Sequence, residues 1–164
     1  MVSHKGFTLP DCGLYRSTRP LPGHEADIPA SLLVYFHNHS ESGLPEVLPP
    51  TRQRHNRWSF SGPGIEIRHL IWVTSLERLL PQGFYALREE LAFDGGSWPA
   101  FTLVQLGYTR QAGPVIFLAQ ERAQLSENDL FFADHGVPIA PGDLALLEAL
   151  TVYREGRPSH ADGP

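Results

Sequence analysis

The sequence predicts a mainly β protein in which two small barrel-like units follow one another as a tandem duplication. Three observations predict it: self-similarity at a fixed spacing, short alternating apolar segments, and many turn residues. The chain has 164 residues with 15 Gly and 15 Pro, a composition that suits short strands joined by turns. We expect the first unit over residues 7–80, the second over 81–153, and a disordered tail over 154–164.

The self-similarity keeps one offset of seventy residues, without a gap, from Gly13 and from Gly83. The matched segments are Gly13-Leu14-Tyr15 with Gly83-Phe84-Tyr85, Ile28-Pro29-Ala30 with Trp98-Pro99-Ala100, Leu33-Val34 with Leu103-Val104, Gly43 with Gly113, and Leu48 with Leu118. These matches fall on turn glycines, on a proline before a strand and on paired core residues. We therefore interpret them as a duplication rather than as chance similarity.

Both units are expected to contain the same elements in the same order. In the first, a strand with the Gly-x-Tyr motif is followed by a polar loop and by strands at 32–39, 46–48, 58–60 and 65–67. In the second, the counterparts after the Gly-x-Tyr strand lie at 102–109, 115–118 and 130–132. A leucine stripe ends each unit, and we expect a short helix there, starting near Thr74-Ser75 and near Asp143.

Four or five short strands and one helical turn in about seventy residues fit an SH3-like barrel, because closure protects short strands from edge pairing. One alternative stays open. The two halves could instead form one fused, pseudo-symmetric β domain.

The second strand of the first unit has two faces because side chains alternate along a strand. The face that stays apolar in both units is expected to point inward; in the first unit it comprises Leu32, Val34 and Phe36. The opposite face begins with Leu33 and carries Tyr35, His37 and His39, for which the second unit has no counterpart. A feature confined to one copy is a candidate for function rather than for folding.

His37 and His39 point the same way and could share a metal ion, with His55, Glu41 or Glu46 completing the site. A catalytic zinc needs about three protein ligands and one open position. His-x-His is common on strands, so solvated surface histidines are the competing interpretation. We accordingly expect no cofactor, with zinc or iron as the alternative.

The segment 52–58 is the strongest local charge feature, and its counterpart in the second unit is acidic. It contains Arg52, Arg54, His55, Arg57 and Trp58. Arginine and tryptophan are enriched at binding hot spots, and the same residues can track phosphates while stacking a base. The net charge of −5 favours a protein partner over nucleic acid. A solvated loop is the alternative without a function.

No catalytic signature is found: the chain lacks a nucleophile elbow, a phosphate loop and a dinucleotide fingerprint. Cys12 is the only cysteine, its counterpart is Gln82, and no spacing pairs it with a histidine. No apolar stretch has the length of a membrane span, and the N-terminus lacks a signal-peptide core. We expect a cytoplasmic protein.

Together these observations predict a non-enzymatic binding or assembly module that recognises a protein partner. The predicted recognition face, with no catalytic residue, comprises Tyr35, His37, His39, Arg52, Arg54, His55, Arg57 and Trp58. Two alternatives remain: a small metal-dependent enzyme using His37, His39 and His55, and a nucleic-acid-binding barrel using the loop at 52–58.

Overall fold

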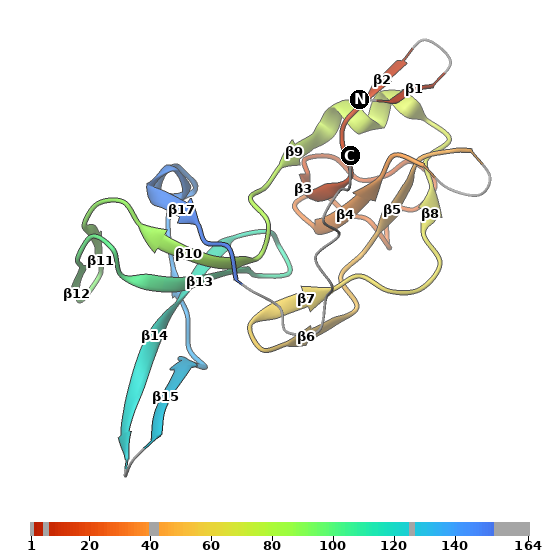
Figure 1. Cartoon of the computed structure of the whole chain (residues 1–164). Coiled ribbons are helices and arrows are strands. Elements are labelled where there is room, and N and C mark those ends of the chain that lie inside the picture. Colours follow the sequence, from red (N-terminus) through yellow and green to blue (C-terminus); the bar gives the residue numbers. More distant parts are fainter. Residues whose placement is uncertain (1, 5–6, 40–42, 125–126, 153–164) are drawn as a thin grey trace, which may run out of the picture.

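The computed structural model describes residues 2–4, 7–39, 43–124 and 127–152 (Figure 1). It is mainly β, as predicted, with several antiparallel sheets and two short 3-10 helices in this part of the chain. The tail predicted to be disordered, at 154–164, lies outside the described residues. At the N-terminus, β1 (Val2–His4) and β2 (Phe7–Leu9) form a hairpin.

The first half forms a five-stranded sheet in the order β8-β5-β4-β3-β9. Its strands are β3 (Gly13–Ser17), β4 (Leu33–His37), β5 (Glu46–Leu48), β8 (Ile65–Glu66) and β9 (Leu76–Arg78). Neighbouring strands are antiparallel. No ladder between described strands joins β8 to β9, so the pairings follow an open path.

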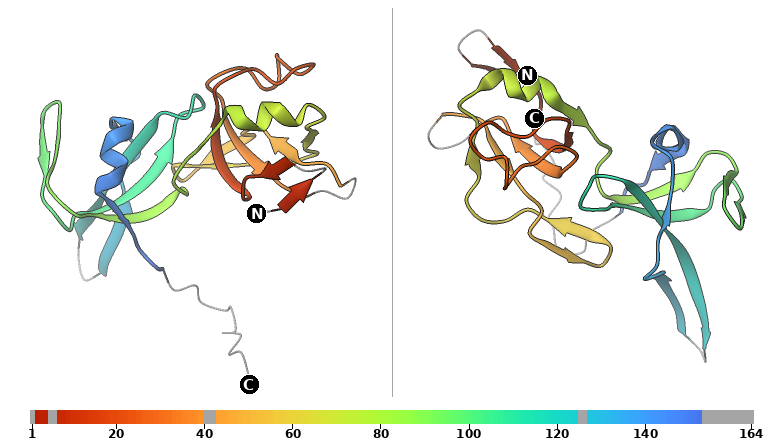
Figure 2. Two further views of the ribbon diagram at one scale, coloured as in Figure 1. Left: turned by 90° about the horizontal axis from the view of Figure 1, so that it is seen from above. Right: turned by 180° about the vertical axis from the view of Figure 1, so that it is seen from behind.

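The second half forms a six-stranded sheet in the order β15-β14-β13-β10-β17, with β16 also paired to β14. Its strands are β10 (Gly83–Leu87), β13 (Leu103–Tyr108), β14 (Pro114–Gln124), β15 (Glu127–Phe132), β16 (Val137–Pro138) and β17 (Leu147–Ala149). The expected strand at 115–118 is the start of the longer β14. The β14–β15 hairpin projects away from the rest of the molecule (Figures 1 and 2).

Two segments expected as loops are hairpins. In the second half, β11 (Leu91–Phe93) pairs with β12 (Gly96–Trp98) where a polar loop was expected. In the first half, β6 (Arg52–Arg54) pairs with β7 (Arg57–Ser59), so the loop interpretation of 52–58 is wrong. The reversal occurs at His55 and Asn56, both with positive φ, and asparagine is one of the residues that tolerate this region best.

The two halves share strand registers at the offset of seventy. Gly13 pairs with Phe36 and Tyr15 with Val34, while Gly83 pairs with Leu106 and Tyr85 with Val104. The hydroxyl groups of both tyrosines donate hydrogen bonds four residues back, from Tyr15 to the Asp11 carbonyl (2.8 Å) and from Tyr85 to the Pro81 carbonyl (2.7 Å). The Gly-x-Tyr motif thus has one local structure in both halves.

The closing helices lie earlier in the chain than predicted. They are the 3-10 helices η1 (Leu70–Ser75) and η2 (Pro141–Leu146), and the leucine stripes after them form the edge strands β9 and β17. A helix start at Thr74 is therefore wrong: the Thr74 hydroxyl donates back to the Ile71 carbonyl at 2.8 Å. A leucine pattern only four residues long fits either a helix or a strand. Here the segments are strands because they pair with β3 and β10.

Two hydrophobic clusters form the core. One lies in the first half, and the other is built mainly from the second half but also includes Leu14 and Leu33 of the first. The inward face predicted for β4 is confirmed, because Leu32, Val34 and Phe36 are at most 4% exposed. Leu33, expected on the opposite face, is also fully buried, and it belongs to the cluster of the second half. Its backbone N–H donates to the Arg110 carbonyl at 2.9 Å. One side of the first sheet therefore packs against the second half.

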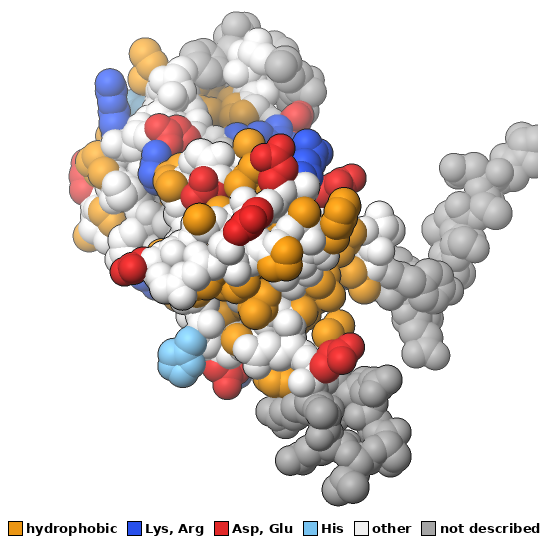
Figure 3. Space-filling view, turned by 90° about the vertical axis from the view of Figure 1, so that its left-hand side faces the viewer, with side chains coloured by type: hydrophobic (Ala, Val, Ile, Leu, Met, Phe, Trp, Pro, Cys, Tyr) orange, Lys and Arg blue, Asp and Glu red, His pale blue; other side chains and the backbone are white. Residues whose placement is uncertain are grey.

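Hydrophobic side chains also gather on the surface of the second half (Figure 3). The exposed large apolar residues of this half are Phe101, Leu130, Leu150 and Val152. In the described part of the chain, neither helix has the length or apolar character that crossing a membrane requires.

Candidate functional site

The register of β3 and β4 brings Cys12 to His37. Gly13 pairs with Phe36, so the residue before β3 faces the last residue of β4 across the ladder. The Cys12 sulfur lies 3.8 Å from His37 Nδ1. Sequence spacing alone could not find this pair, because the two residues are adjacent only through the strand register.

His39 joins the same group through the turn that follows β4. Its Nδ1 lies 3.8 Å from the Cys12 sulfur and 2.7 Å from Asn38 Oδ1. The thiol donates to the same Asn38 oxygen at 3.2 Å, and the Asn38 backbone N–H donates to the sulfur at 3.4 Å. Asn38 is held in turn by a hydrogen bond from Nδ2 to the Pro10 carbonyl, 3.2 Å long.

The nearest ligand atoms of Cys12, His37 and His39 all lie within 4.8 Å of one another, the only such His/Cys/Asp/Glu group in the described residues. The structure thus brings the two predicted histidines together, with Cys12 as the third member. His55 is at the tip of the β6–β7 hairpin, where its Nε2 accepts from Arg54 Nε at 3.1 Å. Glu46 is outside the group, and Glu41 lies outside the described residues.

A cavity of about 350 Å³ adjoins this cluster at the junction of the two halves. Its walls are formed by Cys12, Gly13, Leu14, Tyr35, Arg57, Phe60, Pro81 and Gln82. The Tyr35 ring lies 5.1 Å from the His37 ring and 5.9 Å from the Phe60 ring, between centroids. Cys12 belongs to the cavity and to the cluster, so the two form one site.

The β6–β7 hairpin reaches this junction because it is bound to the second half. Trp58 Nε1 donates to the Tyr108 carbonyl at 2.8 Å. The Gln82 side chain accepts from the Trp58 N–H at 2.8 Å and donates to the Trp58 carbonyl at 3.1 Å. Asn56 Nδ2 donates to Gln105 Oε1 at 3.2 Å. Trp58 thus serves an internal contact rather than a free surface.

The arginines of the hairpin are exposed. Arg54 and Arg57 stand directly opposite each other in the β6–β7 register, and Arg52 is two residues away on β6. Within the described residues none of the three forms an ion pair with a carboxylate. The Arg57 guanidinium donates to the Gln82 carbonyl at 3.3 Å, which turns it toward the cavity.

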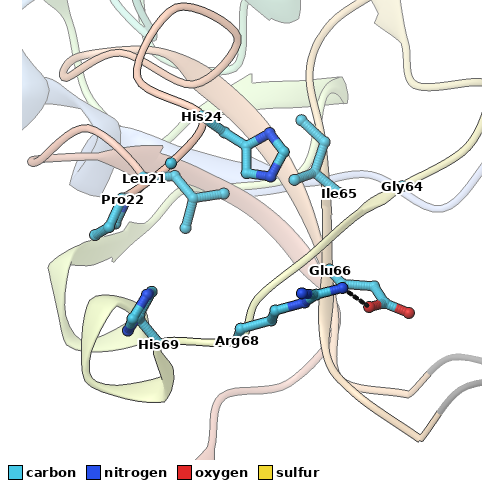
Figure 4. A pocket seen from close by; sticks show the side chains of 9 residues that line it. Leu21, Pro22, His24, Gly64, Ile65, Glu66, Arg68 and His69 are labelled. Atoms are coloured by element: carbon cyan, nitrogen blue, oxygen red, sulfur yellow. Dashed lines mark ion pairs between the residues drawn. The ribbon is translucent and has the colours of Figure 1, made fainter.

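A second cavity, of about 500 Å³, lies in the first half and contains no residue that the sequence singled out (Figure 4). Two histidines, His24 and His69, lie on different parts of its wall, and Arg68 pairs with Glu66 at 3.7 Å (Figure 4). His24 Nδ1 lies 3.6 Å from an Asp27 carboxylate oxygen. Among the described residues, these side chains do not form a group of three metal-ligand types within 4.8 Å of one another, which sets the cavity apart from the Cys12 cluster.

Comparison with protein-family models finds no match, and neither the curated proteins nor the solved structures include one with significant similarity.

Proposed function

We propose that the protein is a non-enzymatic recognition module that binds an acidic segment of a protein partner at the cavity between its halves. The observation that carries this proposal is the position of Arg54 and Arg57. Arg57 lines a cavity with aromatic walls, and Arg54 faces Arg57 in register on the paired strand. Neither arginine has a carboxylate partner among the described residues.

Like charges directly opposite each other on paired strands are destabilising. A carboxylate from a partner would relieve the repulsion between Arg54 and Arg57. Arginine also binds carboxylates through two parallel N–H···O bonds, which makes such a contact specific as well as strong. The third exposed arginine, Arg52, would add to the attraction that steers an acidic segment to this edge.

The cavity supplies the apolar part of the contact. Tyr35 and Phe60 are half-buried and line it beside Arg57. Aromatic anchors beside an arginine are the residue types that dominate binding energy at protein interfaces. A volume of about 350 Å³ lies at the small end of ligand pockets, the size of one or two side chains of a partner segment.

Nucleic-acid binding is supported less well. That hypothesis needs Trp58 to stack on a base, whereas its indole donates to Tyr108 and packs against the cluster of the second half. The net charge of −5 also disfavours a polyanionic ligand.

We further propose that the chain is a tandem duplication of two SH3-like units, at 7–80 and 81–153. The equal strand registers and the two equivalent tyrosine hydrogen bonds support a common origin. The Leu33 contact and the docked β6–β7 hairpin favour halves that work as one body. A cytoplasmic location is proposed on the single cysteine, since such a chain cannot form an intrachain disulfide.

The recognition proposal is tested by affinity capture from cell extract, with mass-spectrometric identification and measurement of the affinity for the captured partner. Arg57→Glu combined with Arg54→Glu should weaken that affinity at least tenfold, because the attraction becomes repulsion. Arg19→Glu, an exposed arginine of the first half outside the hairpin, is the matched control. Equal binding by the double variant and the control would show that the hairpin arginines are not the recognition site.

A further inference from the structure

The Cys12–His37–His39 cluster has a donor set that soft and borderline metal ions prefer. Thiolate and imidazole bind zinc and copper, whereas magnesium and calcium take carboxylate and carbonyl oxygens. Three protein ligands with a fourth position open is the arrangement of catalytic zinc sites. Zinc is the metal for which three protein ligands and one open position are a usual arrangement, whereas His₂Cys copper sites add a weak axial ligand.

The distances suit a tetrahedral ion. Bonds of about 2.3 Å to sulfur and about 2.0 Å to nitrogen, at the tetrahedral angle, separate the sulfur from each nitrogen by about 3.5 Å. In the structure both separations, from the Cys12 sulfur to His37 Nδ1 and to His39 Nδ1, are 3.8 Å. The two sulfur–nitrogen separations are thus a few tenths of an ångström from those of a tetrahedral site, and all three ligand atoms lie within 4.8 Å of one another.

Asn38 provides the surrounding support that metal sites require. Its backbone N–H donates to the Cys12 sulfur, a bond that stabilises a thiolate more than a thiol. Its side-chain oxygen binds the thiol and the His39 ring, which aims both ligand atoms at the same region. Binding of the ion replaces these two bonds. The thiol proton is released to solvent as the sulfur–metal bond forms, and the His39 ring, which donates to Asn38 from Nδ1, takes the tautomer protonated at Nε2.

The cluster is also accessible. Cys12 and His37 are half-buried and His39 is exposed, so an ion can enter without unfolding of the sheet. Cys12 also lines the cavity beside Tyr35, so the cluster adjoins a space that a fourth ligand such as water can enter.

We propose that Cys12, His37 and His39 bind one zinc ion. The site goes beyond the proposed recognition function, since it uses none of the hairpin arginines. It also differs from the set His37, His39 and His55, because the β3–β4 register supplies Cys12 as the third ligand.

The test uses the full chain, stripped of metal with a chelator and titrated with Zn²⁺ in a calorimeter. We expect one ion per chain. Cys12→Ser, His37→Ala and His39→Ala should each weaken binding roughly tenfold or more, since losing even a supporting residue typically costs about ten- to a hundredfold. His69→Ala, a histidine of the other cavity, is the matched control and should change the affinity less than twofold.

Co²⁺ gives a second readout that needs no variant. A cobalt ion bound by Cys12 should show a thiolate-to-cobalt charge-transfer absorption at one equivalent, and Cys12→Ser should lose it while keeping its circular dichroism spectrum. The proposal is overturned if the wild-type chain binds no ion, binds several weakly, or shows no thiolate band. A tenfold loss in His55→Ala would overturn it in favour of the other ligand set.

Zinc binding and partner recognition are separable by a cluster variant outside the cavity wall. His39→Ala should lose Zn²⁺ binding while the affinity for the captured partner stays within about twofold, because His39 does not line the cavity. An equal loss of partner binding in that variant would show that the two functions are not separate, contrary to the proposal.

Discussion

The indole nitrogen of Trp58, on a hairpin of the first half, donates a hydrogen bond of 2.8 Å to the carbonyl oxygen of Tyr108 in the second half. The backbone of Trp58 is bound on both sides by the amide of Gln82. Trp58 thus connects the first half to Tyr108 and Gln82 of the second. These bonds hold the hairpin that carries the arginines at the junction of the two halves.

Gln82→Ala should destabilise the fold by about 2–3 kcal/mol. The backbone N–H and carbonyl of Trp58 would lose their hydrogen-bond partner at a position where the Gln82 side chain is buried. Urea denaturation followed by tryptophan fluorescence measures this change. Gln53→Ala, an exposed glutamine paired with Trp58 in the same hairpin, serves as control and should cost less than about 0.5 kcal/mol. Equal losses in both variants would mean that the Gln82 bonds do not hold the hairpin.

Gly107 is expected to be indispensable for the same junction. A Cβ atom placed there would clash with the backbone carbonyl oxygen of Asn56 and lie 3.0 Å from the Phe117 ring. Gly107→Ala should therefore cost about 1–3 kcal/mol through overpacking, and should loosen the β6–β7 hairpin. Gly83→Ala is the control, since a Cβ there meets nothing within 4 Å. Hydrogen exchange at the Trp58 amide reports the hairpin directly, and unchanged protection in Gly107→Ala would contradict the prediction.

The sequence predicted the elements in which local pattern and tertiary packing agree. The alternation in β4 correctly placed Leu32, Val34 and Phe36 inward, because one buried face is enough to produce it. The alternation could not reveal that Leu33 is buried as well. Leu33 is covered by the second half of the chain, and a contact of that kind produces no periodic pattern in the local sequence. Thr74 illustrates the same limit, because a good N-cap residue lies at the end of a helix whose position is decided by strand pairing.

The candidate site shows which information is missing from a single sequence. His37 and His39 were identified from their spacing on a strand expected at 32–39, although β4 ends at His37 and His39 joins the group through the turn that follows. Cys12 was not, because its contact with His37 depends on the register between β3 and β4. The segment 52–58 was recognised as unusual, but the internal contact of Trp58 was not predicted. A tryptophan beside arginines looks the same in the sequence whether it contacts a partner protein or another part of its own chain.

The proposed duplication predicts equal energetic roles for Tyr15 and Tyr85. Each is buried, and each donates one hydrogen bond to a carbonyl four residues earlier. Tyr15→Phe and Tyr85→Phe should therefore each destabilise the fold by about 1 kcal/mol, with a difference smaller than the loss itself. Chemical denaturation of both variants checks this. A large loss in one and none in the other would show that the shared motif has only local similarity.

Tyr108 should make the stability depend on pH in the alkaline range. Burial raises the pKa of its phenol above the ordinary value of 10.0, and the Tyr85 phenol nearby acts in the same direction. A group whose pKa is raised in the folded state contributes its full stability below its unfolded pKa and loses it as the pH rises beyond that value. The contribution of Tyr108 to the free energy of unfolding should thus be constant below about pH 10 and fall above it. Tyr108→Phe should lower stability at neutral pH by about 1 kcal/mol, because the hydrogen bond to the Leu80 carbonyl is lost, and should flatten the alkaline slope. Urea denaturation at a series of pH values measures both effects, and an unchanged slope in Tyr108→Phe would assign the alkaline loss to another group.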